Sequence, residues 1–154
     1  MNSSIRLFPG TYNANAPYPA AFPGAMGGRG QGLHRDVDLA RATRANVLVA
    51  GAEQAVSNTL AVIVPDLEHA MVIDRASDPL RLPSPLRCAP TVIIRNVDRL
   101  TRDEQRELVD WLMVAKGHAR VIATTSRSLV SMLDGQEFSA TLYYRLNTLY
   151  VDLT

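Results

Sequence analysis

Short apolar runs alternate with amphipathic segments along most of this chain, and this alternation limits the possible folds more than any other feature. Five runs have the length and composition of strands, at residues 46–50, 70–73, 91–94, 121–124 and 149–153. Runs this short and this apolar suit strands that are buried on both faces. Because helical segments separate them, we predict an α/β fold with a parallel sheet and helices on both of its faces.

The segments between these runs have helical spacing of their apolar residues. We predict helices at residues 33–45, 53–64, 101–116, 126–133 and 139–146. The helix at 101–116 has the clearest signals, because Thr101 and Glu104 are spaced as a capping box. Gly117 follows it and can end it in a left-handed conformation. These helices complete a three-layer αβα arrangement.

Two segments are rich in proline or glycine and interrupt this pattern. Residues 1–32 hold four prolines and six glycines, so we expect a flexible arm there and a folded domain over residues 33–154. An alternative is an arm that binds a partner through its aromatic residues, which are Phe8, Tyr12, Tyr18 and Phe22. Residues 74–90 contain four prolines, and we predict that they form mostly loop.

Composition excludes several classes of protein. The 154 residues are enough for one domain with a core, and a net charge of +1 gives no bulk electrostatic reason to bind nucleic acid directly. The lone Cys88 cannot form an internal disulfide, which fits a reducing cytoplasm. The chain has no secretory signal pattern and no run long enough to span a bilayer, so we expect a cytoplasmic protein without a membrane partner.

The stretch from Arg120 to Asn147 carries the most specific pattern: RVIATTSRSL, a short spacer, then EFSATLYYRLN. It resembles the end of the nucleotide-binding module of sigma-54-dependent transcription activators, which are AAA+ ATPases. Those proteins have a strand ending in ATN, then R-x-L, then F-R-x-D-L-Y-Y-R-L-N. The resemblance covers about residues 33–152 and is strongest from residue 91 onward. It implies an AAA+ core, like that of P-loop NTPases, with a five-stranded parallel sheet.

In the register of that family, VLVAGAEQAVSNTL stands where a phosphate-binding loop, G-x-x-x-x-G-K-[ST], is expected. Gly51 takes the first glycine position and Val56 the second, while Ser57 aligns with the lysine and Asn58 with the Ser/Thr. In an active loop, backbone N–H groups wrap the phosphates and the lysine neutralises their charge. The resemblance therefore implies that Gly51, Ser57 and Asn58 are remnants of an ATP site.

The strand that binds the metal in the family has also lost its functional residues here. Its F-L-D-E pattern aligns with IIRN, so Arg95 replaces the magnesium-binding aspartate and Asn96 the glutamate that activates water. A guanidinium repels Mg²⁺, and hydrolysis loses its base. We therefore expect no catalytic residues, no metal and no ATPase activity. Asp98 is a nearby carboxylate, but it is shifted along the chain from both aligned positions.

Two arginines of the family segment reach the phosphates of a neighbouring subunit, and one of them is kept. The first aligns with Ser139, the second with Arg145, and the sensor asparagine with Ser126. The resemblance implies an interaction surface made of Phe138, Tyr143, Tyr144 and Arg145. The alternative for Arg145 is that it only pairs on the surface or packs its stem.

Family members also carry parts that this chain lacks. A long insertion after the second strand contacts the sigma factor there, whereas residues 74–90 show no such sequence. We also expect neither the helical lid nor the DNA-reading helix-turn-helix of those proteins. The Met1 start and the strand at the end favour a natural small protein, an expectation that stands beside that of a truncated chain.

Three functions are compatible with this resemblance. The first is a non-catalytic interaction protein in sigma-54-type transcription regulation, which binds a full-length AAA+ activator or itself. The second is a residual ATP-binding protein without efficient hydrolysis. The third, an ordinary ATPase with rearranged motifs, conflicts with Ser57 and Arg95. A receiver-like fold also has five alternating strands, but it needs an acidic pair where this chain has Ala50 and Gly51.

Overall fold

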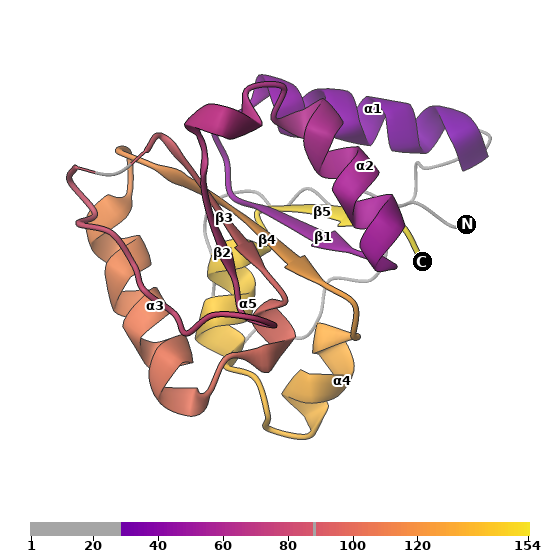
Figure 1. The fold of residues 1–154 in the computed structure, drawn as a ribbon. Helices are drawn as coiled ribbons and strands as arrows, with labels where there is room; N and C mark the ends of the chain where they lie inside the picture. The colour runs from indigo at the N-terminus through magenta and orange to yellow at the C-terminus, as the bar shows by residue number, and fades with distance from the viewer. Residues whose placement is uncertain (1–28, 88) are drawn as a thin grey trace.

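A five-stranded parallel sheet forms the centre of the protein (Figure 1). The structure is a computed structural model, and it describes residues 29–87 and 89–154. The strands lie in the order β2-β3-β4-β1-β5, and every neighbouring pair is parallel. Their bounds are β1 Val47–Ala50, β2 Met71–Asp74, β3 Thr91–Arg95, β4 Arg120–Thr125 and β5 Leu149–Asp152. The predicted α/β class and all five strands are confirmed.

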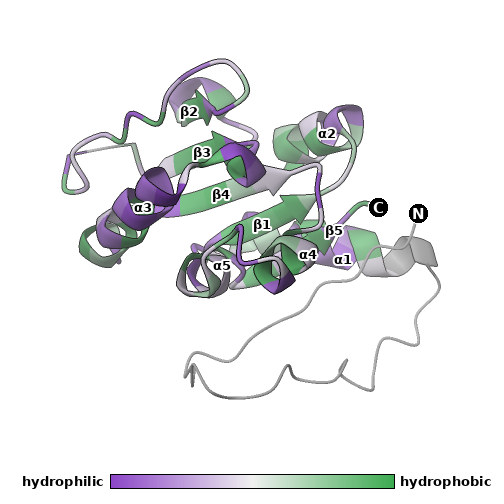
Figure 2. Cartoon of the chain, turned by 90° about the horizontal axis from the view of Figure 1, so that it is seen from below, coloured by the Kyte–Doolittle hydropathy of each residue, from purple (hydrophilic) through white to green (hydrophobic). Residues whose placement is uncertain are grey.

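Helices cover both faces of this sheet, as predicted. The longer ones are α1 Arg29–Ala42, α2 Glu53–Ile63 and α3 Arg102–Ala115, and the shorter ones are α4 Leu129–Asp134 and α5 Ala140–Leu146. Helices α1 and α2 lie on one face, and α3, α4 and α5 lie on the other (Figures 1 and 2). Single 3-10 turns follow α2 at Leu67–His69 and β3 at Val97–Arg99. The result is a three-layer αβα sandwich.

Strand β1 shows how the sequence fills both layers. Val47 and Val49 pack toward α1 and α2, whereas Leu48 packs toward α3 and α5, and all three are at most 1% exposed. Successive side chains of a strand point to opposite faces, so a strand buried on both sides must be apolar throughout. This explains why the strands appear in the sequence as continuous apolar runs instead of alternating ones.

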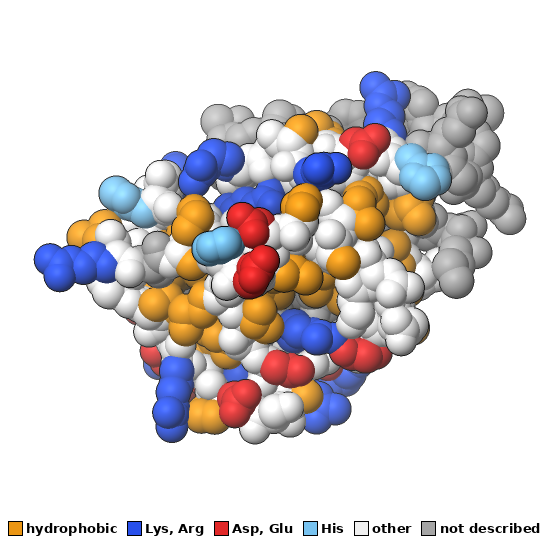
Figure 3. Space-filling model, turned by 45° about the horizontal axis from the view of Figure 1, so that its top comes forward, with side chains coloured by type: hydrophobic (Ala, Val, Ile, Leu, Met, Phe, Trp, Pro, Cys, Tyr) orange, Lys and Arg blue, Asp and Glu red, His pale blue; other side chains and the backbone are white. Residues whose placement is uncertain are grey.

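The sheet ends at β2 on one side, and this edge is less covered than the centre. The layer of α1 and α2 packs over residues of β1, β3, β4 and β5. Val72 of β2 is therefore half exposed, as is Val62 on α2. Figure 3 shows hydrophobic side chains grouped on the surface seen when the α1–α2 side is turned forward.

The capping signals around α3 are confirmed in full. Thr101 Oγ1 accepts from the Glu104 backbone N–H, and the Glu104 carboxylate accepts from the Thr101 N–H, at 3.3 and 2.8 Å. Gly117 has a φ of 85°, the left-handed conformation expected of a glycine after a helix. This segment follows local rules closely enough for the sequence alone to define it.

Two helix starts were predicted wrongly. Helix α1 begins at Arg29, so residues 29–32 belong to the folded domain instead of the predicted flexible arm. The prolines of that arm all precede residue 24, and glycine lowers helix stability by only about 1 kcal/mol per residue without forbidding a helix. Helix α4 begins at Leu129, three residues later than predicted, because Ser128 caps it. The rest of the predicted arm and Cys88 lie outside the described residues.

Arg120, the first residue of β4, fixes α1 to the sheet. Its side chain is only 8% exposed, and its guanidinium donates to the backbone oxygens of Ala40 and Thr43, both at 2.7 Å. These carbonyls belong to the last turn of α1 and the residue after it, where helix carbonyls have no partner within the helix. One buried arginine therefore caps α1 and joins it to a strand distant in sequence.

Replacing Arg120 with methionine keeps much of the apolar stem but leaves both carbonyls without a donor. We expect the free energy of unfolding to fall by about 2–4 kcal/mol, measured by urea denaturation. The matched control is Arg41→Met on the exposed side of α1, which should change stability by about 0.5 kcal/mol or less. Equal effects of the two substitutions would contradict the capping role of Arg120.

Candidate functional site

The carboxyl ends of β1, β3 and β4 meet at one edge of the sheet, where parallel α/β folds hold their ligands. Only Gly51 and Ala52 separate β1 from α2, which begins at Glu53. The residues aligned with the interior of a phosphate-binding loop are therefore the first turn of a helix. The Val56 N–H donates to the Ala52 oxygen at 2.9 Å, an ordinary helical hydrogen bond.

Gly51 is needed for packing at this edge. A Cβ on Gly51 would lie 2.7 Å from the Leu153 Cβ, and contacts that short do not occur in folded proteins. The Gly51 N–H donates to the Thr125 oxygen, and the Leu153 N–H donates to the Ala50 oxygen. Close approach of the chain after β5 thus accounts for this glycine without any ligand.

The other two residues predicted at the nucleotide site have protein partners. Arg95 Nη2 lies 3.1 Å from Ser57 Oγ and also donates to the carboxylate of Glu53. Asn58 Oδ1 accepts from the Gln54 side chain at 3.0 Å on the exposed surface of α2. The fold therefore brings the positions of Ser57 and Arg95 together, as the family register implied. The Arg95 side chain is 22% exposed, so this contact is partly shielded from solvent.

The residues after β3 are also held by protein groups. Asn96 is in the left-handed conformation, with φ 57° and ψ 50°, and its side-chain amide donates to Asp74 Oδ1 at 2.8 Å. Asp98 is 6% exposed and accepts from the Thr125 hydroxyl at 3.1 Å. Ser126 is exposed. Asp98 is thus buried and engaged with Thr125, an arrangement different from an open metal ligand.

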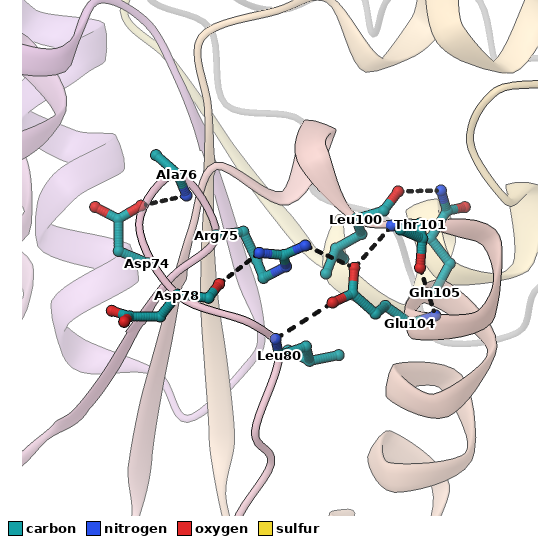
Figure 4. A network of polar contacts seen from close by, with 9 residues as sticks. All are labelled: Asp74, Arg75, Ala76, Asp78, Leu80, Leu100, Thr101, Glu104 and Gln105. Carbon is teal, nitrogen blue, oxygen red and sulfur yellow. Dashed lines mark hydrogen bonds and ion pairs between the residues drawn. The ribbon is translucent and has the colours of Figure 1, made fainter.

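A polar network next to this edge fixes the segment that follows β2 (Figure 4). Arg75 Nη2 lies 2.9 Å from Glu104 Oε2, and Glu104 Oε1 accepts from the Leu80 N–H at 3.3 Å. The same carboxylate completes the capping box of α3 with Thr101. Farther along, the Trp111 indole donates to the Pro83 oxygen at 2.7 Å. The proline-rich loop is therefore attached to α3 at several points.

Glu104 is the carboxylate on which this network centres. Burial by itself would raise the pKa of Glu104, but hydrogen bonds from the Thr101 backbone, Arg75 and the Leu80 backbone, with the positive charge of Arg75, hold it below its usual value. The ionised form is therefore the one that stabilises the fold.

The predicted interaction residues divide into two groups. Phe138 and Tyr143 are each 4% exposed and belong to the core under α3 and α5, so as individual side chains they cannot contact a partner in this state. Tyr144 and Arg145 are half buried and reach the surface. The side-chain amide of Asn46 donates to the Arg145 oxygen at 3.0 Å, which places the end of α5 at the amino ends of β1 and β4.

A family model described as "Sigma-54 interaction domain" matches residues 29–154. The chain belongs to the sigma-54 interaction domain family. The match begins at the first residue of α1, so this helix is part of the family fold. Comparison with curated protein sequences gives no match.

Solved structures share the fold of this sigma-54 interaction domain at low identity. NtrX from Brucella abortus in complex with ATP has a TM-score of 0.64 at 14% identity, over 79% of this chain and 34% of NtrX. The P-loop NTPase domain of the sigma-54 transport activator from E. coli has a TM-score of 0.54 at 20% identity, over 79% of this chain and 93% of that domain. Domain III of DnaA from Thermotoga maritima has a TM-score of 0.56 at 18% identity, over 82% of this chain and 62% of that domain. This chain spans about a third of the NtrX chain.

Glu53 is the residue of this sigma-54 interaction domain that sequence reasoning missed. Its carboxylate pairs with Arg95, yet it precedes Arg95 by 42 residues, and only the tertiary fold joins them. A signal was present, because an acidic residue in the first turn of a helix opposite an arginine at a strand end can form such a pair.

Neither a metal centre nor a membrane span is found in the part of the chain that the structure describes. No three His, Cys, Asp or Glu side chains in residues 29–87 and 89–154 are grouped to hold an ion. No described helix is both long and apolar enough to cross a bilayer. Two surface hollows of about 550 and 330 Å³ are lined by residues of α3, α4 and α5 and of the turns beside them, and neither Gly51 nor Arg95 lines them.

Replacing Glu104 with glutamine tests the network of this domain. A carboxyl group with a lowered pKa stabilises the fold above its ordinary value of 4.5, and this contribution is lost as the pH falls through the lowered value. Glu104→Gln should therefore lower the free energy of unfolding by about 1–2 kcal/mol at pH 7 and by much less near pH 3. Urea denaturation at both pH values measures this. The exposed Glu107→Gln is the control, and a pH-independent loss in Glu104→Gln would refute the assignment.

Proposed function

We propose that this sigma-54 interaction domain is a non-catalytic regulatory protein of sigma-54-type transcription, which acts through protein contacts. It neither hydrolyses ATP nor needs ATP for its structure. Its partner is a full-length AAA+ activator or a second copy of the chain. The observation that carries this proposal is the contact of Arg95 with Ser57 and Glu53 at the nucleotide edge.

The chemistry of this contact opposes Mg-ATP. An active site of this class needs a cation opposite the outer phosphates and a carboxylate for Mg²⁺. Here an uncharged Ser57 stands at the cation position and a guanidinium at the metal position, and Nη2 of that guanidinium pairs with Glu53. Nucleotide binding would have to break the Arg95–Glu53 pair and bring Mg²⁺ toward a positive charge, which is electrostatically unfavourable.

The backbone opposes ATP independently. A phosphate-binding loop presents several free N–H groups to the ligand. In this chain the corresponding residues are in α2 from Glu53 onward, and the Val56 N–H is already bonded to Ala52. Forming the loop would unwind the first turn of α2 and remove Val56, which is 3% exposed, from the core.

The surface near the end of α5 supports a role in protein contacts. Arg145 is half buried, its carbonyl is fixed by Asn46, and it lies at the amino ends of the strands, away from Arg95. Because Arg145 lies at the opposite end of the strands from Arg95, it suits a contact with another subunit. We assign the contact to Arg145 and Tyr144, with Phe138 and Tyr143 supporting them from the core.

Titration calorimetry with ATP and Mg²⁺ tests the absence of a nucleotide site. We expect no binding heat at ATP concentrations up to about 1 mM, because loss of the lysine and the metal carboxylate removes charge-assisted contacts worth about 1.5–3 kcal/mol each. Micromolar, magnesium-dependent binding would overturn the proposal in favour of a residual ATP-binding protein.

A double substitution separates the two obstacles to ATP. Ser57→Lys with Arg95→Asp restores both charges but leaves α2 starting at Glu53. We expect no gain in ATP binding, since the residues that would have to wrap around the phosphates stay in the first turn of α2. Binding by this variant alone would show that side-chain chemistry is the only obstacle.

Capture of partners by the tagged chain in its source cells tests the proposed contact. Arg145→Ala should reduce the amount of captured AAA+ activator or of a second copy by about tenfold, as expected for a central arginine of an interface. Arg127→Ala is the matched control, since its side chain is 57% exposed and lies on another element. Equal capture by both variants would show that Arg145 is not part of the interface.

A further inference from the structure

A groove of about 550 Å³ lies between α3 and the start of α5. It is on the α3–α5 side of the sheet, opposite to α1 and α2 (Figure 1). Val109 and Leu133 give it apolar sides, and Phe138 lies beneath it in the core. Ala140 and Thr141 form the wall on α5, and these small side chains leave room for another chain to approach.

Gln105 holds the groove open in one shape. It is 3% exposed, its amide donates to the oxygens of Leu100 and Glu137, and its oxygen accepts from the Ser139 N–H at 2.7 Å. The bonds to Glu137 and Ser139 join the start of α3 to the segment before α5, and the bond to Leu100 holds the turn that precedes α3. Both walls are therefore fixed before any ligand arrives, which lowers the entropy lost on binding.

The α3 wall of the groove carries Arg102, Arg106 and Val109. Met113 continues the same face of the helix one turn beyond the groove, because the four residues are spaced by four, three and four. Met113 is 58% exposed. The nearest carboxylate recorded for Arg106 is that of Asp103 at 3.7 Å, where both side chains are more than three-quarters exposed and the pair is weak.

Arginines outnumber carboxylates among the residues that line the groove. Asp103 and Asp110 are three and four residues from Arg106, so they lie beside it on the exposed side of α3 and reduce its positive charge, but they do not line the groove. Glu137 is the one carboxylate that lines the groove, and it lies 3.9 Å from Arg127. Arg102 donates to the Gln136 oxygen at 3.3 Å, so its charge is still available to a ligand.

We propose that this groove binds an acidic amphipathic helix of a partner protein. Apolar side chains of that helix pack on Val109 and Met113, and its carboxylates pair with Arg102 and Arg106. A groove between two helices accepts a third helix through residues at i, i+3, i+4 and i+7. Arginine binds carboxylates through two parallel hydrogen bonds, which favours an acidic partner. The proposal does not depend on the loss of ATP binding, because no groove residue belongs to the nucleotide edge.

A pair of synthetic peptides tests the groove on the full chain. Both are fluorescent helices of about 15 residues with leucines along one face, and the flanking positions are glutamate in one and lysine in the other. We expect the glutamate peptide to bind at least about tenfold more tightly in fluorescence anisotropy. Equal affinity for the two peptides, or tighter binding of the lysine peptide, would overturn the proposal.

Variants of α3 locate the binding. Arg106→Glu and Met113→Asp should each lower the affinity for the glutamate peptide by about tenfold or more. Val114→Asp is the matched control, since Val114 is 53% exposed on the same helix but lies off the face that carries Arg106 and Met113. This variant should bind the glutamate peptide as tightly as the wild type does. Circular dichroism verifies folding, and Met113→Asp stands in if Arg106→Glu does not fold. Equal effects of Met113→Asp and Val114→Asp, or competition by a DNA or RNA oligonucleotide, would contradict the assignment.

Discussion

Burial of β1 on both of its faces and both of its edges is the constraint on which the other elements depend. Val47 pairs with Ile122 of β4 and with Leu149 of β5, so this strand joins β5 to the other three strands of the sheet. Its alternate side chains contribute to both cores. Because a parallel neighbour can be reached only by a crossover, each strand beside β1 requires a helix on one face or the other.

At the carboxyl ends of β1, β3 and β4 the polar side chains bond to other protein groups. Arg95 bonds to Ser57 and Glu53, Asn96 to Asp74, and Asp98 to Thr125. In a ligand-binding site such groups would face a phosphate or a metal. Here they close on each other across the ends of neighbouring strands, which stabilises a single arrangement of this edge. These contacts are the physical basis of the proposed non-catalytic role.

Contacts of α3 fix the loop after β2 and the segment before α5. Glu104 fixes the loop after β2, Trp111 holds Pro83, and Gln105 holds the segment before α5. Three residues of one helix thus order two loops that the sequence does not define by itself. The exposed side of the same helix carries the arginines and apolar residues of the proposed groove.

The sequence by itself determined the strands, the capped helix α3 and the left-handed Gly117, because these follow from periodicity and local hydrogen bonds. That Gly51, Ser57 and Asn58 mark the place of a nucleotide site stays a prediction. The sequence also indicated correctly that Ser57 and Arg95 lie at one site. Only the tertiary structure decided that Glu53 neutralises Arg95, that Arg120 caps α1, and that Phe138 and Tyr143 are buried. Those outcomes depend on residues tens of positions apart, and no local pattern specifies which of many exposed or buried partners a side chain will meet.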